Sequence, residues 1–230
     1  MSARVFERIV AGTAYGAVVL FCLLFLWYAW IPLLIVGGVI AYLELTRLVW
    51  RAFDRPGRLV ALVVGGLYIA GGLAALAQLQ FAWAGEISTV QPSFGRWALL
   101  ALAVTWAADI AAYAVGSRIG RRRIAPRLSP GKTVEGTAAG LAAAALTAIG
   151  FGAVYDLAPV GVAIVALLAG PAALAGDLIE SALKRAAGVK DAGGLIPGHG
   201  GVLDRIDSLL LVAPVVYLAF VVARSGMMVR

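Results

Sequence analysis

The chain has 230 residues, of which 62% are hydrophobic and only 13% are charged. A water-soluble domain cannot cover so many apolar side chains with a polar exterior, so the composition excludes a soluble globular protein and predicts a membrane protein. The formal net charge of +7 does not indicate nucleic acid as a partner, because basic residues of membrane proteins gather on cytoplasmic loops and no basic–aromatic alternation occurs here.

Apolar segments of about 20 residues, the length that crosses a bilayer, follow one another along the chain. The first is too long for the apolar part of a signal peptide, and it holds the single cysteine, Cys22, which has no thiol partner and is expected to pack. It meets the second at Ile31-Pro32, where the proline either separates two helices or kinks one long helix. We predict an all-α bundle of about seven spans, with a range of six to nine. The predicted spans are 9–30, 31–48, 59–80, 97–117, 135–155, 158–180 and 207–224.

The basic residues indicate the orientation of this bundle. With seven spans and a cytoplasmic N-terminus, only Arg96, Arg224 and Arg230 lie on the outer side. The two longest polar segments, 118–134 and 181–206, then share the cytoplasmic face. We therefore predict a multi-pass protein of the inner (plasma) membrane whose polar site faces the cytoplasm. We expect a single membrane domain, with N-terminal helices in 1–96 and the polar motifs in 97–230.

Acidic residues inside spans are costly and usually mark function. Glu44 lies near a span end, where a structural pairing with Arg47 and a functional role are both open. Asp109, Asp177 and Glu180 each lead into a cytoplasmic polar segment, so they are expected to converge near one membrane surface.

The segment around 177–208 carries the most chemistry. Four of its side chains have i, i+3, i+4 and i+7 spacing and share one face of a helix, and two further aspartates follow at i, i+3. Carboxylates without Cys or His partners suit Mg²⁺, which beside Lys and Arg is typical of a nucleoside triphosphate site. Glycines between 193 and 201 would let backbone amides approach phosphate oxygens. The alternative is a solvated loop whose charges balance one another. The residues concerned are Asp177, Glu180, Ser181 and Lys184, then Asp204 and Asp207.

Two blocks of this sequence resemble the phosphatidate cytidylyltransferase (CDP-diacylglycerol synthase) family. The run from Ser181 to Asp207 matches the family signature of Ser, Lys-Arg, Lys-Asp, a small residue, Pro-x-His-Gly-Gly and Asp-Arg-x-Asp. The run from Asp109 to Gly136 is similar to its Asp-x-x-Ala-Tyr and Ser-Pro-x-Lys-Thr-x-Glu-Gly elements. The Gly-Lys-Thr in that run is not a P-loop, because Pro126 stands where that loop needs glycine. The resemblance covers about 97–208, while 1–96 matches only in hydrophobic character.

The resemblance implies an enzyme that joins CTP to phosphatidic acid from the bilayer and releases pyrophosphate. It implies Mg²⁺ as the cofactor, a second cation such as K⁺ sharing the centre, and a homodimer. The aspartates expected to bind Mg²⁺ are Asp177, Asp204 and Asp207, and Lys184 and Arg205 complete the catalytic set. Substrate contacts are expected from Asp109, Ser129, Lys132, Thr133, Glu135, Arg185, Lys190, Asp191, His199, Gly200 and Gly201.

Some roles and two rival functions stay open from the sequence. His199 either hydrogen-bonds a phosphate or the cytidine or holds the glycine-rich loop in shape, and Asp109 either contacts the metal or CTP or packs between helices. A related enzyme acting on an isoprenoid ether lipid would carry the same headgroup chemistry. A cation-coupled transporter would also use intramembrane carboxylates, although it leaves the clustering of polar residues on one face unexplained.

Overall fold

The computed structural model describes residues 3–81, 95–195 and 200–228, and in these ranges the chain forms seven helices and one two-stranded hairpin. The predicted all-α bundle is confirmed, and the hairpin is an addition within the polar segment 118–134, where a loop was expected. The elements are α1 (Ala3–Phe25), α2 (Trp27–Ala52), α3 (Arg55–Phe81), α4 (Arg96–Ile119), β1 (Arg123–Ala125), β2 (Ser129–Thr133), α5 (Val134–Tyr155), α6 (Pro159–Ala186) and α7 (Leu203–Met228).

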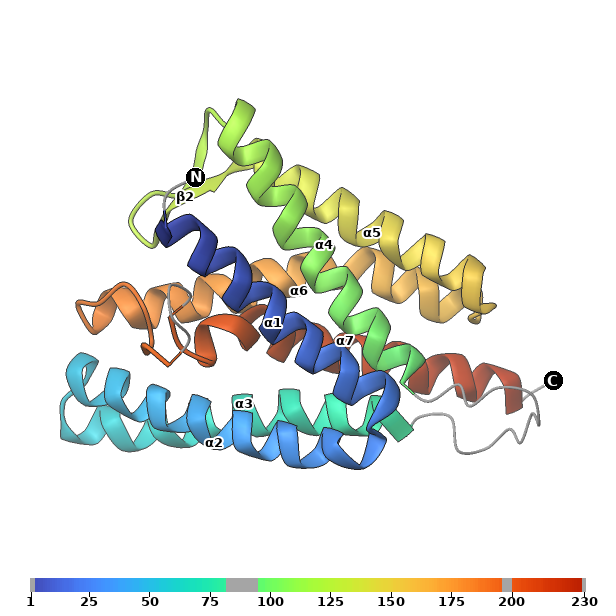
Figure 1. Ribbon diagram of the computed structural model, residues 1–230, viewed down its shortest axis with the longest axis horizontal. Helices are drawn as coiled ribbons and strands as arrows, with labels where there is room; N and C mark the ends of the chain where they lie inside the picture. Colours follow the sequence, from blue (N-terminus) through green and yellow to red (C-terminus); the bar gives the residue numbers. More distant parts are fainter. Residues whose placement is uncertain (1–2, 82–94, 196–199, 229–230) are drawn as a thin grey trace.

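The polar connections gather at one end of the bundle. Figure 1 shows the α2–α3 turn, the β1–β2 hairpin and the start of α7 at the same end of the bundle. The two longest polar segments therefore share one face of the molecule, as the distribution of basic residues predicts.

Among the described residues, six helices, α2 to α7, are long and apolar enough to cross a membrane, which is the lower limit of the predicted range. In α1 the apolar stretch with described side chains, Gly12–Phe25, is shorter than a span. Large apolar side chains such as Leu67 and Val154 point outward, 69% and 77% exposed, as expected for surfaces that face lipid.

The break between the first two helices was predicted at the wrong residue. It lies at Leu26, which has non-helical backbone angles, and Pro32 lies inside α2. Proline removes only one backbone hydrogen bond from the helix, and such losses are tolerated in membrane helices where neighbouring groups compensate. Trp30, one residue from Ile31, is almost fully buried in the core and holds this part of α2 against the bundle.

Small residues allow α4, α5, α6 and α7 to approach closely. On α5 the buried positions recur every fourth residue and form a stripe along one face. A Cβ atom added at Gly136 would lie 2.6 Å from the carbonyl oxygen of Ala112 on α4. The stripe consists of Gly136, Gly140, Ala144, Ala148 and Gly152.

Two neighbouring glycines on α3 give a matched test of this packing. A Cβ at Gly72 would lie 2.7 Å from the carbonyl oxygen and 2.8 Å from the Cα of Leu210 on α7, while Gly71 has nothing within 4 Å. We expect Gly72→Ala to destabilise the bundle by about 1–3 kcal/mol because a backbone must move. Thermal unfolding in detergent should show a lower midpoint for Gly72→Ala than for Gly71→Ala. Equal midpoints would contradict the close approach of α3 and α7.

Candidate active site

A cavity of about 570 Å³ lies among α4, α5, α6, α7 and β2. One part of its wall is made of small and apolar residues of α4, α5 and α6, including Gly140, Leu141 and Gly170. The remaining wall carries five cationic and six acidic side chains, which makes the cavity strongly polar but nearly neutral. They are Lys132, Lys184, Arg185, Lys190 and Arg205, with Asp109, Asp177, Glu180, Asp191, Asp204 and Asp207.

The junction of the hairpin and α5 brings Lys132 into the cavity. The Thr133 hydroxyl caps α5 by accepting a hydrogen bond from the amide of Gly136 at 3.1 Å. The Glu135 carboxylate accepts from the amides of Arg121 and Arg122 at 3.0 and 3.3 Å. These bonds hold β2 against the end of α4, and the Lys132 ammonium lies 2.5 Å from the Asp177 carboxylate on α6.

Arg185 connects the hairpin to the end of α6. Its guanidinium donates from Nε to the carbonyl of Leu128 at 3.1 Å and from Nη1 to the carbonyl of Val189 at 3.0 Å. Arg185 therefore fixes the hairpin turn relative to the loop that follows α6, in addition to lining the cavity.

Lys184 lies between two buried carboxylates. Its ammonium contacts Glu180 one turn earlier on α6 and lies 2.7 Å from Oδ1 of Asp204 on α7. The other oxygen of Asp204 accepts from the amides of Ala192 and Gly201, both at 2.8 Å. Asp204 thus joins α6, the loop between α6 and α7, and the start of α7. The hydrogen bonds that the structure shows for it hold these elements together.

Three other aspartates come from three different helices and line the same cavity. Asp177 accepts a hydrogen bond from the Ser181 hydroxyl at 3.2 Å, and Asp207 accepts from the amide of Ser208 at 2.7 Å. Asp109, Asp177 and Asp207 lie close enough to act on one another electrostatically. Their mutual repulsion favours a cation between them.

The donor set fits Mg²⁺ in part. In the described part of the chain, no group of three or more Asp, Glu, His or Cys side chains is placed to hold a metal ion. Mg²⁺, however, is usually held by one or two carboxylates together with waters and substrate phosphates. Asp177 and Asp207 offer that arrangement once Asp177 exchanges its contacts with Lys132 and Ser181 for the ion. Asp204, the third predicted ligand, has its oxygens engaged by Lys184 and two backbone amides.

The structure brings most of the predicted site residues together. Glu135, Gly200 and Gly201 do not line the cavity: Glu135 holds the backbone after α4, and the Gly201 amide is donated to Asp204. His199 lies outside the described residues. The predicted residues that line the cavity are Asp109, Ser129, Lys132, Thr133, Asp177, Lys184, Arg185, Lys190, Asp191, Asp204, Arg205 and Asp207.

Glu180 shares a helix face with Asp177 and Lys184, as its spacing predicts, but it was not among the residues assigned a catalytic, substrate or metal role. Its side chain is 4% exposed, lines the cavity and pairs with Lys184. Its i, i+4 spacing to Lys184 also indicates the ion pair between them, which gives Glu180 a role beside Lys184 at the cavity.

The chain is similar to several known proteins. A model described as the cytidylyltransferase family matches residues 86–223. A phosphatidate cytidylyltransferase of Synechocystis sp. is 50% identical over 122 residues, covering 52% of this chain and 41% of that protein. One of Bacillus subtilis is 45% identical over 120 residues (51% and 44%), and one of Pseudomonas aeruginosa is 40% identical over 159 residues (66% and 57%). The matches to these curated relatives extend over roughly half of their length.

Proposed function

Because the chain belongs to the cytidylyltransferase family, we propose that it joins CTP to phosphatidic acid, giving CDP-diacylglycerol and pyrophosphate. The observation that carries this proposal is the cavity, in which charged residues from both sequence blocks meet an apolar wall between membrane helices. The charged part suits a triphosphate and a lipid phosphate, and the apolar part suits the lipid tail.

The reaction forms a bond between a phosphate oxygen of the lipid and the α-phosphorus of CTP, and it breaks the bond from that phosphorus to the β-phosphate bridge. The lipid phosphate is already an anion, so alignment and charge neutralisation matter more than a general base. Lys132 and Arg205 are suited to contact the phosphates because both are cations on the cavity wall.

The near-neutral cavity cannot by itself offset the negative charge of a triphosphate and a lipid phosphate. Asp177 and Asp207, with Asp109 beside them, are the residues that would hold Mg²⁺. When bound, the ion supplies charge neutralisation for the triphosphate and for the departing pyrophosphate. A second cation such as K⁺ is part of the proposal through the family resemblance.

The lipid would enter from the bilayer while CTP arrives from water. Leu141 and Leu174 line the apolar wall together with glycines of α5 and α6. The same two helices carry apolar side chains that face outward, such as Leu146 and Leu167. The α2–α3 turn and the hairpin, both of which contain arginines, lie at the same end of the bundle (Figure 1), and hairpin residues line the cavity, which supports a cytoplasmic site on the inner membrane. Homodimerisation is a further part of the proposal.

The direct test is turnover by the purified protein with labelled CTP, phosphatidic acid and Mg²⁺ in mixed micelles. We expect a labelled lipid product that requires both the lipid and Mg²⁺. A parallel reaction with an isoprenoid ether lipid phosphate distinguishes the related enzyme, and cation flux into proteoliposomes tests transport. Absence of the labelled lipid with either substrate would refute a lipid cytidylyltransferase.

Lys132→Met is expected to reduce kcat/KM for CTP about 10- to 100-fold, equivalent to about 1.4–2.7 kcal/mol of transition-state stabilisation. The reason is the loss of a cation at the cavity wall. Arg127→Met is the matched control, since Arg127 belongs to the same hairpin connection, is exposed and does not line the cavity. Equal kinetics of the two variants would argue against a phosphate contact by Lys132.

A further inference from the structure

Glu44 is a buried carboxylate on α2 that the proposed reaction does not use. It is 3% exposed, and its hydrogen-bond partners Val202 and Leu203 belong to an apolar cluster formed by α2, α3 and the start of α7. It stands outside the segment that the family model matches, which begins at residue 86. Arg47, the local partner that the sequence left open, forms no ion pair with it in the described part of the chain.

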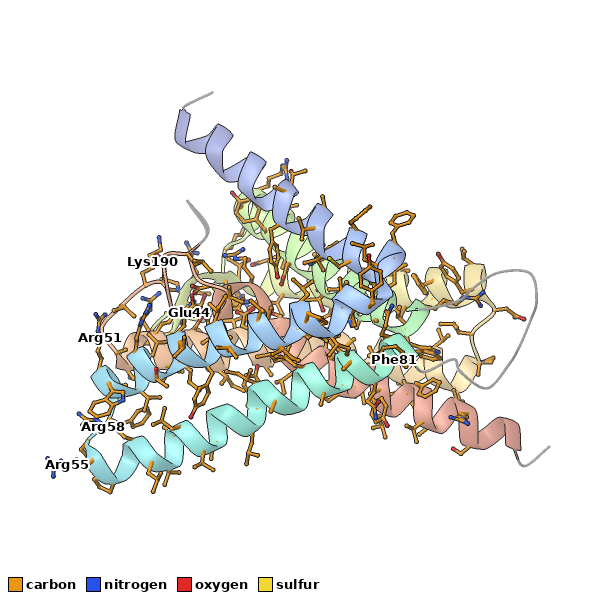
Figure 2. All side chains as sticks on the ribbon, turned by 60° about the horizontal axis from the view of Figure 1, so that its bottom comes forward. Glu44, Arg51, Arg55, Arg58, Phe81 and Lys190 are labelled. Atoms are coloured by element: carbon orange, nitrogen blue, oxygen red, sulfur yellow. The ribbon has the colours of Figure 1, made fainter. Side chains whose placement is uncertain are left out.

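The Glu44 carboxylate instead binds the start of α7. One oxygen accepts from the amide of Val202 at 3.2 Å and the other from the amide of Leu203 at 2.8 Å. These amides belong to the first turn of a helix, where no intrahelical acceptor exists and the helix dipole favours a negative charge. Glu44 therefore caps α7 from another helix, and Figure 2 shows it on α2 at the same end of the molecule as Lys190.

Two glycines make room for this carboxylate. A Cβ atom at Gly193 or at Gly201 would overlap the Glu44 carboxylate, and neither glycine has a positive φ. Space around Glu44, and not backbone conformation, is therefore what glycine provides at these two positions. Gly194, the next residue, has nothing within 4 Å.

The start of α7 is held from two sides. Glu44 binds the amides of Val202 and Leu203, and Asp204 binds the amide of Gly201 and the Lys184 ammonium. The following residues, Arg205 and Asp207, line the cavity from the same first two turns. A small rotation or fraying of this turn would displace both side chains from the cavity.

We propose that Glu44 is a positioning residue, which holds the first turn of α7 so that Arg205 and Asp207 face the cavity. The role in turnover rests on the proposed function, while the capping of α7 does not. The N-terminal helices thereby contribute to the site through α2, although the polar motifs lie in the second half of the chain.

Glu44→Gln is the main variant, because it keeps the size of the side chain but replaces one accepting oxygen with an amide group that faces a backbone donor. We expect kcat to fall about 10- to 100-fold, as for other displacements of about 1 Å at reacting groups. We also expect the Mg²⁺ concentration for half-maximal rate to rise severalfold, with less change in KM for CTP. A role in stability alone would lower the unfolding midpoint without moving the Mg²⁺ dependence.

Hydrogen exchange distinguishes the capping of α7 by Glu44 from the effect of Glu44 on turnover. A peptide that spans residues 201–210 should exchange faster in Glu44→Gln than in the unchanged protein, whether or not CTP is a substrate. If exchange is faster in Glu44→Gln but the unchanged protein does not turn over CTP, the proposed function is refuted and the capping of α7 by Glu44 is retained. Unchanged exchange, or an unchanged kcat and Mg²⁺ dependence, would overturn the positioning role.

A double-mutant cycle tests the packing around Glu44. Gly193→Ala should lower kcat because its methyl group displaces the carboxylate, and Gly194→Ala should cost less. In a Glu44→Ala background the methyl group has room, so adding Gly193→Ala should change kcat little further. Equal losses from the two alanines, or full additivity of Glu44→Ala and Gly193→Ala, would contradict the proposal.

Discussion

Asp207→Asn is expected to lower turnover about a thousandfold or more while leaving the bundle folded. Asn keeps the oxygen that accepts from Ser208, and the Tyr68 hydroxyl binds only the backbone carbonyl of residue 207. Removing this charge also relieves repulsion from Asp177 and Asp109, so the unfolding midpoint should stay equal or rise slightly. A factor of a thousand corresponds to about 4 kcal/mol, the size expected when a metal ligand is lost.

Asp204→Asn provides the contrast, because Asp204 makes structural bonds. It accepts from Lys184 and from two backbone amides, and an amide group cannot serve both sets. We expect it to lose activity and also about 1–3 kcal/mol of stability. Mg²⁺ titration of turnover and thermal unfolding in detergent, run on both variants, give the comparison. Full activity in Asp207→Asn, or a fall in its midpoint equal to that of Asp204→Asn, would contradict the division of roles.

The helical part of the site was predictable because helix geometry is local. The i, i+3, i+4 and i+7 spacing from Asp177 to Lys184 needs only the pitch of one helix, and the structure has these residues on the cavity wall. The long apolar segments likewise predict the bounds of α3 to α7 to within six residues. The break at Leu26 was not predictable from proline, because Pro32 lies inside α2 and the burial of Trp30 keeps that part of α2 packed in the bundle.

The hairpin could not be predicted from its own residues. β2 has the sequence Ser-Pro-Gly-Lys-Thr, which has low strand propensity, and β1 is three residues long. What holds it comes from elsewhere in the fold: Glu135 binds the backbone at Arg121 and Arg122, and Arg185 binds Leu128. Interactions of this kind depend on how the helices pack, which a single sequence does not reveal.

Glu44 and Asp204 show the same limit at single residues. Arg47 is near Glu44 in sequence, yet the carboxylate reaches amides more than 150 residues away. Asp204 and Asp207 look equivalent as an i, i+3 pair, but only the environment of each carboxylate separates a loop-binding role from a cavity-facing one. The sequence therefore predicts which charged residues gather at the site, but not which of them face the cavity and which hold the loop in place.

Lys184→Met is expected to have the largest effect on stability, a loss of about 3–5 kcal/mol. Lys184 is 12% exposed, and its two carboxylate partners, Glu180 and Asp204, are each 4% exposed. Neither carboxylate oxygen of Glu180 has a hydrogen-bond partner among the described residues, so its ion pair with Lys184 is its main compensation. Without the ammonium, Glu180 loses its compensation and Asp204 keeps only the amides of Ala192 and Gly201, so two buried negative charges lack a cation.

Lys132→Met supplies the control, because its ion pair with Asp177 is more open, at 21% and 28% exposure. An ion pair of that kind contributes about 0–1 kcal/mol, so the unfolding midpoint of Lys132→Met should stay close to that of the unchanged protein although its turnover falls. Equal midpoints for Lys132→Met and Lys184→Met would contradict the argument from burial.

Adding Glu180→Gln to Lys184→Met should recover part of the lost stability, because it removes one of the two unpaired charges. The recovery should be incomplete, since Asp204 still lacks its cation. Activity should not recover with it, because Asp204 can then no longer fix the loop against α6 and the first turn of α7 loses one of its two supports. A double variant no more stable than Lys184→Met alone would show that Glu180 does not depend on Lys184 for compensation.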